Sequence, residues 1–303
     1  MLLDAASLYF RAFFGVPDQR RTPQEPASNA VRGFLDMIAT LVSAHRPGAL
    51  VACWDDDWRP AFRVAAIPTY KSHRLANPTS AAEEVPDELA PQVPVIAAAL
   101  AAVGIARLGC PGFEADDVIG TLTTRATGRC PVRIVTGDRD LFQLVDDAAD
   151  IAVLYTAKGG VREATVVDQA YLQATYGVPT GSAYADLATL RGDSSDGLPG
   201  VRGIGEKTAA VLIGRYGSLE GLQAALAAGD PALKGAQRTR LLEAADYLRV
   251  APSVVQVARD APLPEVTGAL PTEVADVRVL SELAVSHNLA GPFTRLLTAL
   301  GLS

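Results

Sequence analysis

Five carboxylates in two tight groups dominate the middle of the chain. The groups are Glu114, Asp116 and Asp117, then Asp138 and Asp140. Like charges about 5 Å apart repel by roughly 3 kcal/mol per pair at an effective dielectric constant near 20. A fold that brought the groups together would need counter-charge, and divalent cations with oxygen ligands are a usual supply. Taken alone, either group is also consistent with a helix start or a turn.

The two groups belong to different kinds of element. Apolar residues at helical spacing follow the first group, so these acids open a predicted helix with one buried face. Glu114 and Asp117, three residues apart, would share one side of that helix. The run Val132 to Thr136 predicts a buried strand, with the second group just after its carboxyl end, where open α/β sheets bind ligands. A further helix is expected after Asp140.

Two other predicted strands also end in aspartate. Residues 1 to 4 read MLLD, which places Asp4 at the end of a strand. The second strand, Leu50 to Trp54, leads into an acidic triplet, in which Asp55 is preferred as a ligand because it comes first and Asp56 is the alternative. Carboxyl ends of parallel strands share one edge of a sheet, so these acids can converge with Asp138. A strand-to-helix turn is the simpler interpretation of Asp4 on its own.

The segment from Trp58 to Pro94 combines basic and aromatic side chains. It contains Arg59, Arg63, Tyr70, Lys71, His73 and Arg74. Such a mixture suits phosphate contacts and base stacking, although a solvated surface would have a similar composition. Because the segment directly follows a candidate metal ligand, we expect it to be mobile and to face the substrate.

A glycine-rich stretch, GDSSDGLPGVRGIGEKTA, extends from Gly192 to Ala209. Its acids are Asp193 and Asp196, and its last three glycines are Gly200, Gly203 and Gly205. The two acids can point at the cations that the other carboxylates would bind. The glycines can present free N–H groups at the start of the next helix. Glu206 interrupts a Walker A pattern, and no strand precedes the stretch as a Rossmann fingerprint requires. The interpretation left is a helix-hairpin-helix that binds the backbone of a duplex, and a plain turn between two helices is the alternative.

The remaining segments predict a mixed α/β chain without further chemistry. We expect helices at 31–45, 93–106, 166–176, 184–190 and 207–216, a strand at 151–155, and helices with proline-rich breaks after 219. Three cysteines without CxxC spacing, Cys53, Cys110 and Cys130, indicate buried free thiols and a cytoplasmic protein. No apolar run reaches the length of a membrane span.

The net charge of −7 does not exclude a nucleic-acid partner. If nine carboxylates are metal ligands, the other 25 acids nearly balance the 27 bases. The position of the basic residues then matters more than the total charge.

Taken together, these residues resemble the flap endonuclease family, specifically the 5′-nuclease domain of bacterial DNA polymerase I and its stand-alone relatives. The matching motifs are Asp4, WDDDWRPAFR, YKSHR, GFEADD, TGDRDLFQL and the glycine-rich stretch. The last three, in this order, are highly specific. The resemblance covers nearly the whole chain.

The resemblance implies a central, mostly parallel sheet flanked by helices, a helical arch at about 58–94 and a helix-hairpin-helix. We expect a nuclease core at 1–170, a hairpin subdomain at 171–250 and a C-terminal helical segment at 251–303 that packs back on the core. The implied metal ligands are Asp4, Asp55, Glu114, Asp116, Asp117, Asp138, Asp140, Asp193 and Asp196. Tyr70, Lys71 and Arg74 match the arch, where the lysine and arginine contact the scissile phosphate. Expected DNA contacts are Arg11, Arg63, Gly200, Arg202, Gly203, Gly205, Lys207 and Thr208.

The implied activity is hydrolysis of DNA phosphodiesters, as a 5′-flap endonuclease and 5′-3′ exonuclease in replication and repair. Two or three Mg²⁺ or Mn²⁺ ions would serve as cofactors, with K⁺ at the hairpin as in relatives. The expected partner of a monomer is DNA with a 5′ single-stranded flap, or a branched or nicked duplex. The alternatives are a PIN-like ribonuclease and a non-catalytic protein that binds DNA junctions.

Overall fold

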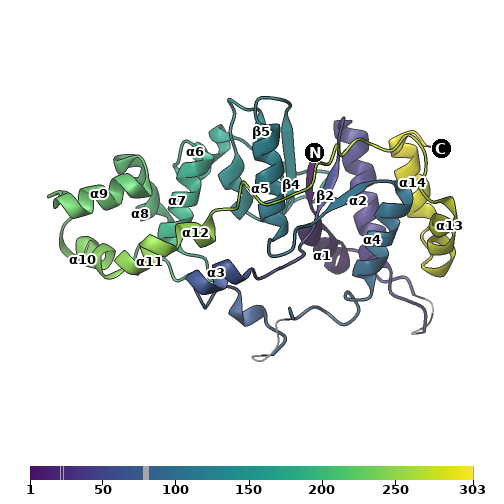
Figure 1. Cartoon of the computed structure of the whole chain (residues 1–303), viewed down its shortest axis with the longest axis horizontal. Helices are drawn as coiled ribbons and strands as arrows, with labels where there is room; N and C mark the ends of the chain where they lie inside the picture. Colours follow the sequence, from purple (N-terminus) through teal and green to yellow (C-terminus); the bar gives the residue numbers. More distant parts are fainter. Residues whose placement is uncertain (21, 23, 78–81, 303) are drawn as a thin grey trace.

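The computed structural model describes the chain except for residues 21, 23, 78–81 and 303. A six-stranded sheet in the order β3-β2-β1-β4-β5-β6 lies at its centre (Figure 1). The strands are β1 Leu2–Asp4, β2 Val51–Cys53, β3 Ala106–Leu108, β4 Val132–Thr136, β5 Ile151–Tyr155 and β6 Thr165–Val167. All neighbouring pairs are parallel except β5 and β6, which are antiparallel. The expected mostly parallel α/β sheet is therefore confirmed.

Helices cover both faces of the sheet because its strands are apolar on both sides. Along β1, Leu2 belongs to one buried cluster and Leu3 to the other. The first face packs against α5 (Ala115–Ala126), and the second against α1 (Ala5–Gly15) and α2 (Asn29–His45). Burial on both faces explains why these strands read as continuous apolar runs and not as alternating ones.

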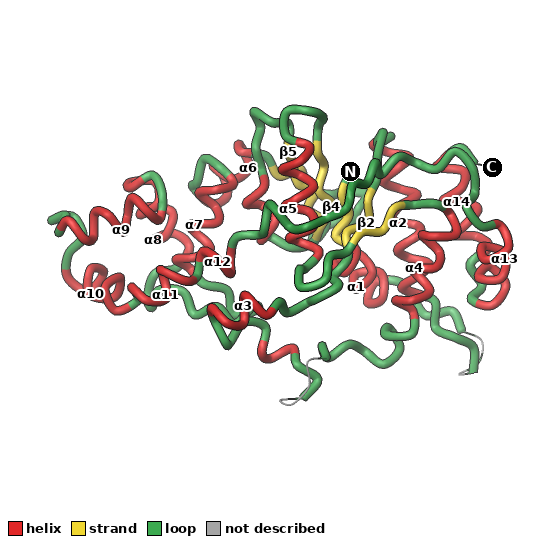
Figure 2. Tube along the Cα trace, viewed as in Figure 1, coloured by secondary structure: helices red, strands yellow, loops and turns green. Residues whose placement is uncertain are grey.

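A helical region follows the sheet and extends away from it (Figure 1). It comprises α6 Gln169–Tyr176, α7 Gly181–Arg191, α8 Glu206–Tyr216, α9 Leu219–Ala228, α10 Gly235–Glu243, α11 Ala245–Val250 and α12 Pro252–Val255. Residues 256–276 then return along the core without a helix or strand (Figure 2). They lead to α13 (Val277–Ser286), which packs against α4 (Gln92–Val103), and to α14 (Ala290–Leu300), which packs against α2. The boundaries 1–170, 171–250 and 251–303 stay a prediction.

Several expected elements differ from those observed. The helix expected from residue 93 ends at Val103, and β3 follows it; the helix expected from residue 166 begins at Gln169. Val166 and Val167 belong instead to β6 and pair with β5, because β-branched residues fit a strand edge better than a helix. Asp168 then caps α6 by accepting from the Tyr171 amide at 2.7 Å.

The expected arch contains little helix. Its described part holds only α3 (Ala61–Ala66) and the 3₁₀ turn η1 (Ser72–Arg74) before α4, and the rest is loop (Figure 2). Pro60, Pro68 and Pro86 interrupt any longer helix, since proline lacks the amide that an interior position donates. The helix expected after Asp140 is likewise a short 3₁₀ turn, η2 (Asp140–Leu144).

Two further expectations concern the cysteines and membrane-spanning helices. Cys53 and Cys110 are buried free thiols as expected, but Cys130 is exposed because it lies on the loop before β4. In the part of the chain that the structure describes, no helix is long and apolar enough to cross a membrane.

Candidate active site

Acidic side chains gather at the carboxyl edge of three neighbouring strands. Asp4 is the last residue of β1, and Asp55 and Asp138 each lie two residues beyond the ends of β2 and β4. Because β1 lies between β2 and β4 in the sheet, these three residues approach one another. The first turn of α5 adds Asp116, and all four line a cavity of about 670 Å³.

Hydrogen bonds fix three of these carboxylates. Asp4 caps α1 by accepting from the Ser7 amide at 3.1 Å, and it accepts from the Thr136 hydroxyl at 2.6 Å. Asp55 accepts from the Ala115 amide at 2.8 Å, which ties the end of β2 to the start of α5. Asp138 accepts from the Asp140 amide at 2.9 Å. The backbone of the strand ends therefore holds the acids in position.

Five of the nine candidate ligands have no ion pair within the described residues: Asp4, Asp55, Asp116, Asp138 and Asp140. Burial, with a smaller contribution from nearby Asp55, raises the pKa of Asp4 to about 7. Burial also raises the pKa of Asp55. It raises the pKa values of Asp116 and Asp140 well above the ordinary range, and the nearby charge of Asp138 raises both of these further. A cluster of carboxylates without ion pairs of their own suits hard divalent cations.

The other four candidates are already engaged by basic side chains. Lys71 binds Glu114, Arg74 binds Asp196 at 2.8 Å, and Arg191 lies 3.6 Å from Asp193. The fourth candidate, Asp117, pairs with Arg63. In the described part of the chain, no three carboxylate, imidazole or thiol groups are arranged to hold one ion. The nine acids therefore fall into a paired set and an unpaired set, and their ligation of two or three ions stays a prediction.

Arg63 and Asp117 form a buried unit below the cavity. Arg63 is only 2% exposed, and its two terminal nitrogens donate to both oxygens of Asp117 at 2.6 and 2.7 Å. It also binds Glu114 at 2.7 Å, and Asp117 accepts the Ala258 amide at 2.7 Å. The expected DNA contact by Arg63 and metal ligation by Asp117 are at odds with this burial, because each group is already satisfied inside the protein.

The segment from Tyr70 to Arg74 reaches the cavity, although not in the expected manner. Tyr70 is 3% exposed and donates to Glu114 at 2.7 Å, so its ring has no free face for base stacking. Lys71 and Arg74 do line the cavity, where each is paired with an acid. Lys71 adopts a left-handed backbone conformation with φ 47°, which points to a tightly fixed turn.

Asp55 and Asp56 face in different directions. Asp55 lines the cavity, whereas Asp56 is exposed outside it, against Gly109 and 4.0 Å from Arg107. This geometry favours Asp55 as the metal ligand of the pair.

The glycine-rich stretch connects α7 and α8 through a tight loop. Gly200 and Gly203 have φ of 63° and 72°, and a side chain on Gly200 would collide with the Arg191 carbonyl at 2.4 Å. Arg202 and Lys207 are exposed. The stretch therefore offers basic side chains around a bend that requires glycine. Gly205 and Thr208 flank the start of α8. Arg11 lies apart, half-exposed on α1, and donates to the Ala157 carbonyl at 3.3 Å.

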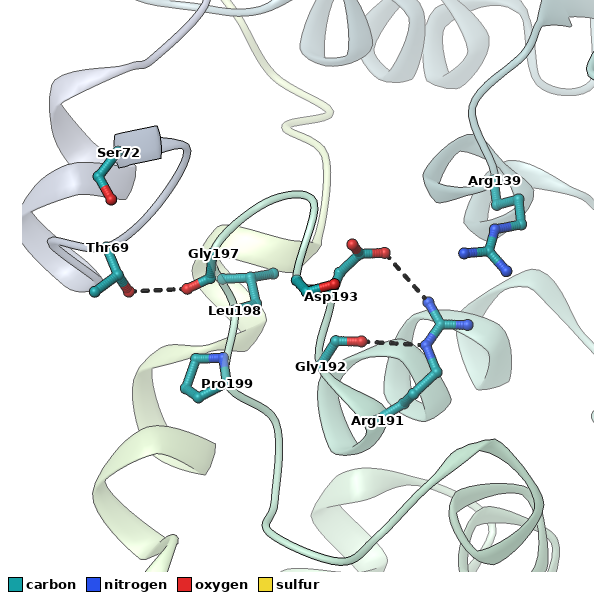
Figure 3. Close-up of a pocket in the computed structure, with 10 residues that line it drawn as sticks. Thr69, Ser72, Arg139, Arg191, Gly192, Asp193, Gly197, Leu198 and Pro199 are labelled. Atoms are coloured by element: carbon teal, nitrogen blue, oxygen red, sulfur yellow. Dashed lines mark hydrogen bonds and ion pairs between the residues drawn. The ribbon is translucent and has the colours of Figure 1, made fainter. Parts of the chain in front are cut away.

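Sequence reasoning missed two arginines beside the acids. Arg139 lies between two aspartates of the TGDRD motif, and Arg191 directly precedes Gly192. Arg139 lines the acidic cavity and an adjoining one, and Arg191 lines the second (Figure 3). The position of one inside an acidic motif and of the other directly before one was the available signal.

The raised pKa of Asp4 predicts a pH-dependent stability that cations reverse. The unfolded chain has the ordinary pKa of 3.8 and the folded chain about 7, so the folded state holds the proton more tightly. Stability therefore falls as pH rises between these values, by on the order of 2 to 4 kcal/mol for this group. We expect urea unfolding of wild type in EDTA to show this decrease from pH 4 to pH 8, and Mg²⁺ to offset it at pH 8.

The matched variants separate Asp4 from other titrating groups. Asp4→Asn should flatten the decrease and reduce the stabilisation by Mg²⁺, whereas Asp56→Asn should preserve both. Identical pH slopes for wild type and Asp4→Asn would show that Asp4 ionises normally in the folded chain.

Comparisons with known proteins add the following similarities. The family model "5′-3′ exonuclease, N-terminal resolvase-like domain" matches residues 1–177, and "5′-3′ exonuclease, C-terminal SAM fold" matches residues 179–278. The chain is 59% identical over 303 residues to a 5′-3′ exonuclease of Streptomyces coelicolor, covering 99% of both chains. It is 49% identical over 310 residues to one of Mycobacterium tuberculosis, covering 99% and 97%. The crystal structure of the bacteriophage T5 flap endonuclease with DNA and metal ions matches with a TM-score of 0.64 and 16% identity, covering 99% and 97%.

Proposed function

The chain belongs to the 5′-3′ exonuclease family, and from that membership and the site we propose that it cleaves 5′ flaps and removes nucleotides from 5′ ends of DNA. Two or three Mg²⁺ or Mn²⁺ ions would bind in the acidic cavity. The observation that carries the proposal is the convergence of Asp4, Asp55, Asp116 and Asp138 without ion pairs among the described residues. Nothing but cations or protons can compensate such a group.

Asp4, Asp55, Asp116, Asp138 and Asp140 would hold the cations. Bound divalent ions supply an activated water and stabilise the oxygen that leaves the phosphate. Glu114 positions Lys71 at the cavity wall, and the Asp196 carboxylate positions Arg74. We expect the side chains of Lys71 and Arg74 to turn from these acids towards the scissile phosphate, where they would neutralise developing charge.

The hairpin from Gly200 to Thr208 would hold the duplex on the side of the cut away from the 5′ flap. Arg202 and Lys207 are exposed and have no ion pair in the described ranges, so they can bind phosphates. The backbone from Gly200 to Thr208 could also bind K⁺ through carbonyl groups. Contacts of this kind recognise the backbone and not the bases, so selectivity would follow the shape of the branch. We further propose a monomer that acts in the cytoplasm.

A matched set of substrates tests the function. The purified chain should cleave a 5′-flap duplex with Mg²⁺ or Mn²⁺ and not with EDTA, and it should cleave a 3′-flap duplex and single-stranded RNA far more slowly. Preference for the RNA would favour a PIN-like ribonuclease. Tight junction binding without cleavage in either metal would favour a non-catalytic junction protein.

The two neighbouring aspartates provide a specific prediction. Asp55→Asn is expected to lower kcat by about a hundredfold, because it removes a charge from the cavity, whereas Asp56→Asn should stay within about twofold of wild type. Cleavage of the 5′-flap duplex under single-turnover conditions measures both. The reverse order of effects would assign ligation to Asp56.

A further inference from the structure

A second cavity of about 700 Å³ adjoins the acidic cavity. Its lining includes Thr69, Ser72, Arg139, Arg191, Asp193 and Ser194. Arg139 and Asp193 line both cavities and so form the boundary between them. The second cavity lies between the segment that carries Lys71 and the loop that leads from α7 into the hairpin (Figure 3).

Two guanidinium groups point towards one another in this cavity. Arg139 extends from the loop after β4 and Arg191 from the end of α7 (Figure 3). Arg191 is partly compensated, since it donates to Glu206 at 3.1 Å and lies 3.6 Å from Asp193. The nitrogen that faces Asp193, Nη2, is buried, and at 3.6 Å it is beyond hydrogen-bond distance of that carboxylate.

Arg139 has a different environment. It is exposed and forms no ion pair within the described residues, although aspartates flank it on both sides. A guanidinium that served only to neutralise Asp138 and Asp140 would pair with them. Figure 3 instead shows it directed into the cavity, towards Arg191. The cavity therefore presents one guanidinium without an ion pair in the described structure, beside a second whose Nη2 has only a long contact to Asp193, and the two together favour an anion.

We propose that Arg139 and Arg191 form a subsite for the DNA phosphate next to the scissile one, on the duplex side of the cut. The proposal rests on the nuclease function proposed above. The planar fork of arginine matches phosphate oxygens, and Ser72 and Ser194 add hydroxyl donors at the cavity wall. The duplex side follows from the chain path, because the loop that lines this cavity continues directly into Gly200 and the hairpin. Such a subsite would fix the cleavage position along the strand.

Substrates with one neutral methylphosphonate test this assignment. A series of 5′-flap duplexes carries the modification at successive positions around the cut, and Kd is measured in Ca²⁺ and KM and kcat in Mg²⁺. Wild type should lose about tenfold in Kd at one position on the duplex side. Arg139→Gln should show that loss with unmodified DNA and be insensitive to the same modification, because the interaction is already absent. Its binding should also depend less on salt, by about one unit of slope.

Two variants serve as comparisons. Arg133→Gln removes a half-buried arginine of β4 that pairs with Asp150 outside both cavities, and it should behave as wild type. Arg139→Lys keeps the charge without the fork and should restore part of the affinity.

The subsite is rejected if Arg139→Gln stays as sensitive as wild type at every position. It is also rejected if kcat falls with KM and Kd unchanged. If the wild-type protein bound unmodified DNA but never cut it, the proposed function would be contradicted. The binding series in Ca²⁺ would still decide the subsite.

Discussion

Asp138→Asn should lower kcat for cleavage of a 5′-flap duplex by about a thousandfold, while Kd for the same duplex in Ca²⁺ changes by less than about threefold. Asp138 lines the acidic cavity and has no ion pair in the described chain. Its side chain accepts the Asp140 amide, and asparagine can preserve this bond and the volume. The substitution therefore removes the charge that would bind a cation and leaves the hairpin and the fold intact.

Single-turnover cleavage across a Mg²⁺ titration measures this effect. A shift of the titration to higher Mg²⁺ would indicate weakened ion binding, and a lower plateau would indicate a misplaced ion. Asp150→Asn is the matched control, because Asp150 is an exposed aspartate paired with Arg133 outside the cavity. Turnover by Asp138→Asn at the wild-type rate would refute the metal role of this residue.

The acids at the strand ends could be predicted from sequence because the signal is local. Each is preceded by an apolar run, and a buried parallel sheet brings the ends of such runs to one edge. Val132 to Thr136 was predicted with the bounds that β4 has, and Asp4, Asp55 and Asp138 lie at the expected edge. Residue pattern and sheet geometry were sufficient for these positions.

Pairing between distant residues could not be predicted in the same way. Arg63 is separated from Asp117 by 54 positions, and its basic, aromatic-rich surroundings resemble a DNA-binding surface. Only the folded chain shows that α3 places this side chain under α5. For the same reason the sequence did not distinguish the acids bound by Lys71 and Arg74 from the unpaired ones.

The buried Arg63 unit leads to a prediction about stability. Arg63→Met is expected to lower the free energy of unfolding by about 3 to 5 kcal/mol, because it leaves Asp117, which is 0% exposed, without its ion-pair partner. Glu114 keeps its contact with Lys71, so most of the loss should come from Asp117. Urea unfolding at pH 7 measures the change. Arg133→Met, at an exposed pair, should lose less than about 1 kcal/mol.

A second substitution distinguishes unpaired charge from lost packing. Adding Asp117→Asn to Arg63→Met removes the stranded carboxylate and should recover about half of the lost stability, since the cost of breaking a buried pair lies mainly in the charge left behind. Asparagine can still accept the Ala258 amide that Asp117 accepts at 2.7 Å. If the double variant were no more stable than Arg63→Met, the loss would arise from the arginine's packing and its bonds to the Val254 and Gln256 carbonyls. The unit would then tether the segment after α12 to the core, and not compensate charge beneath the acidic cavity.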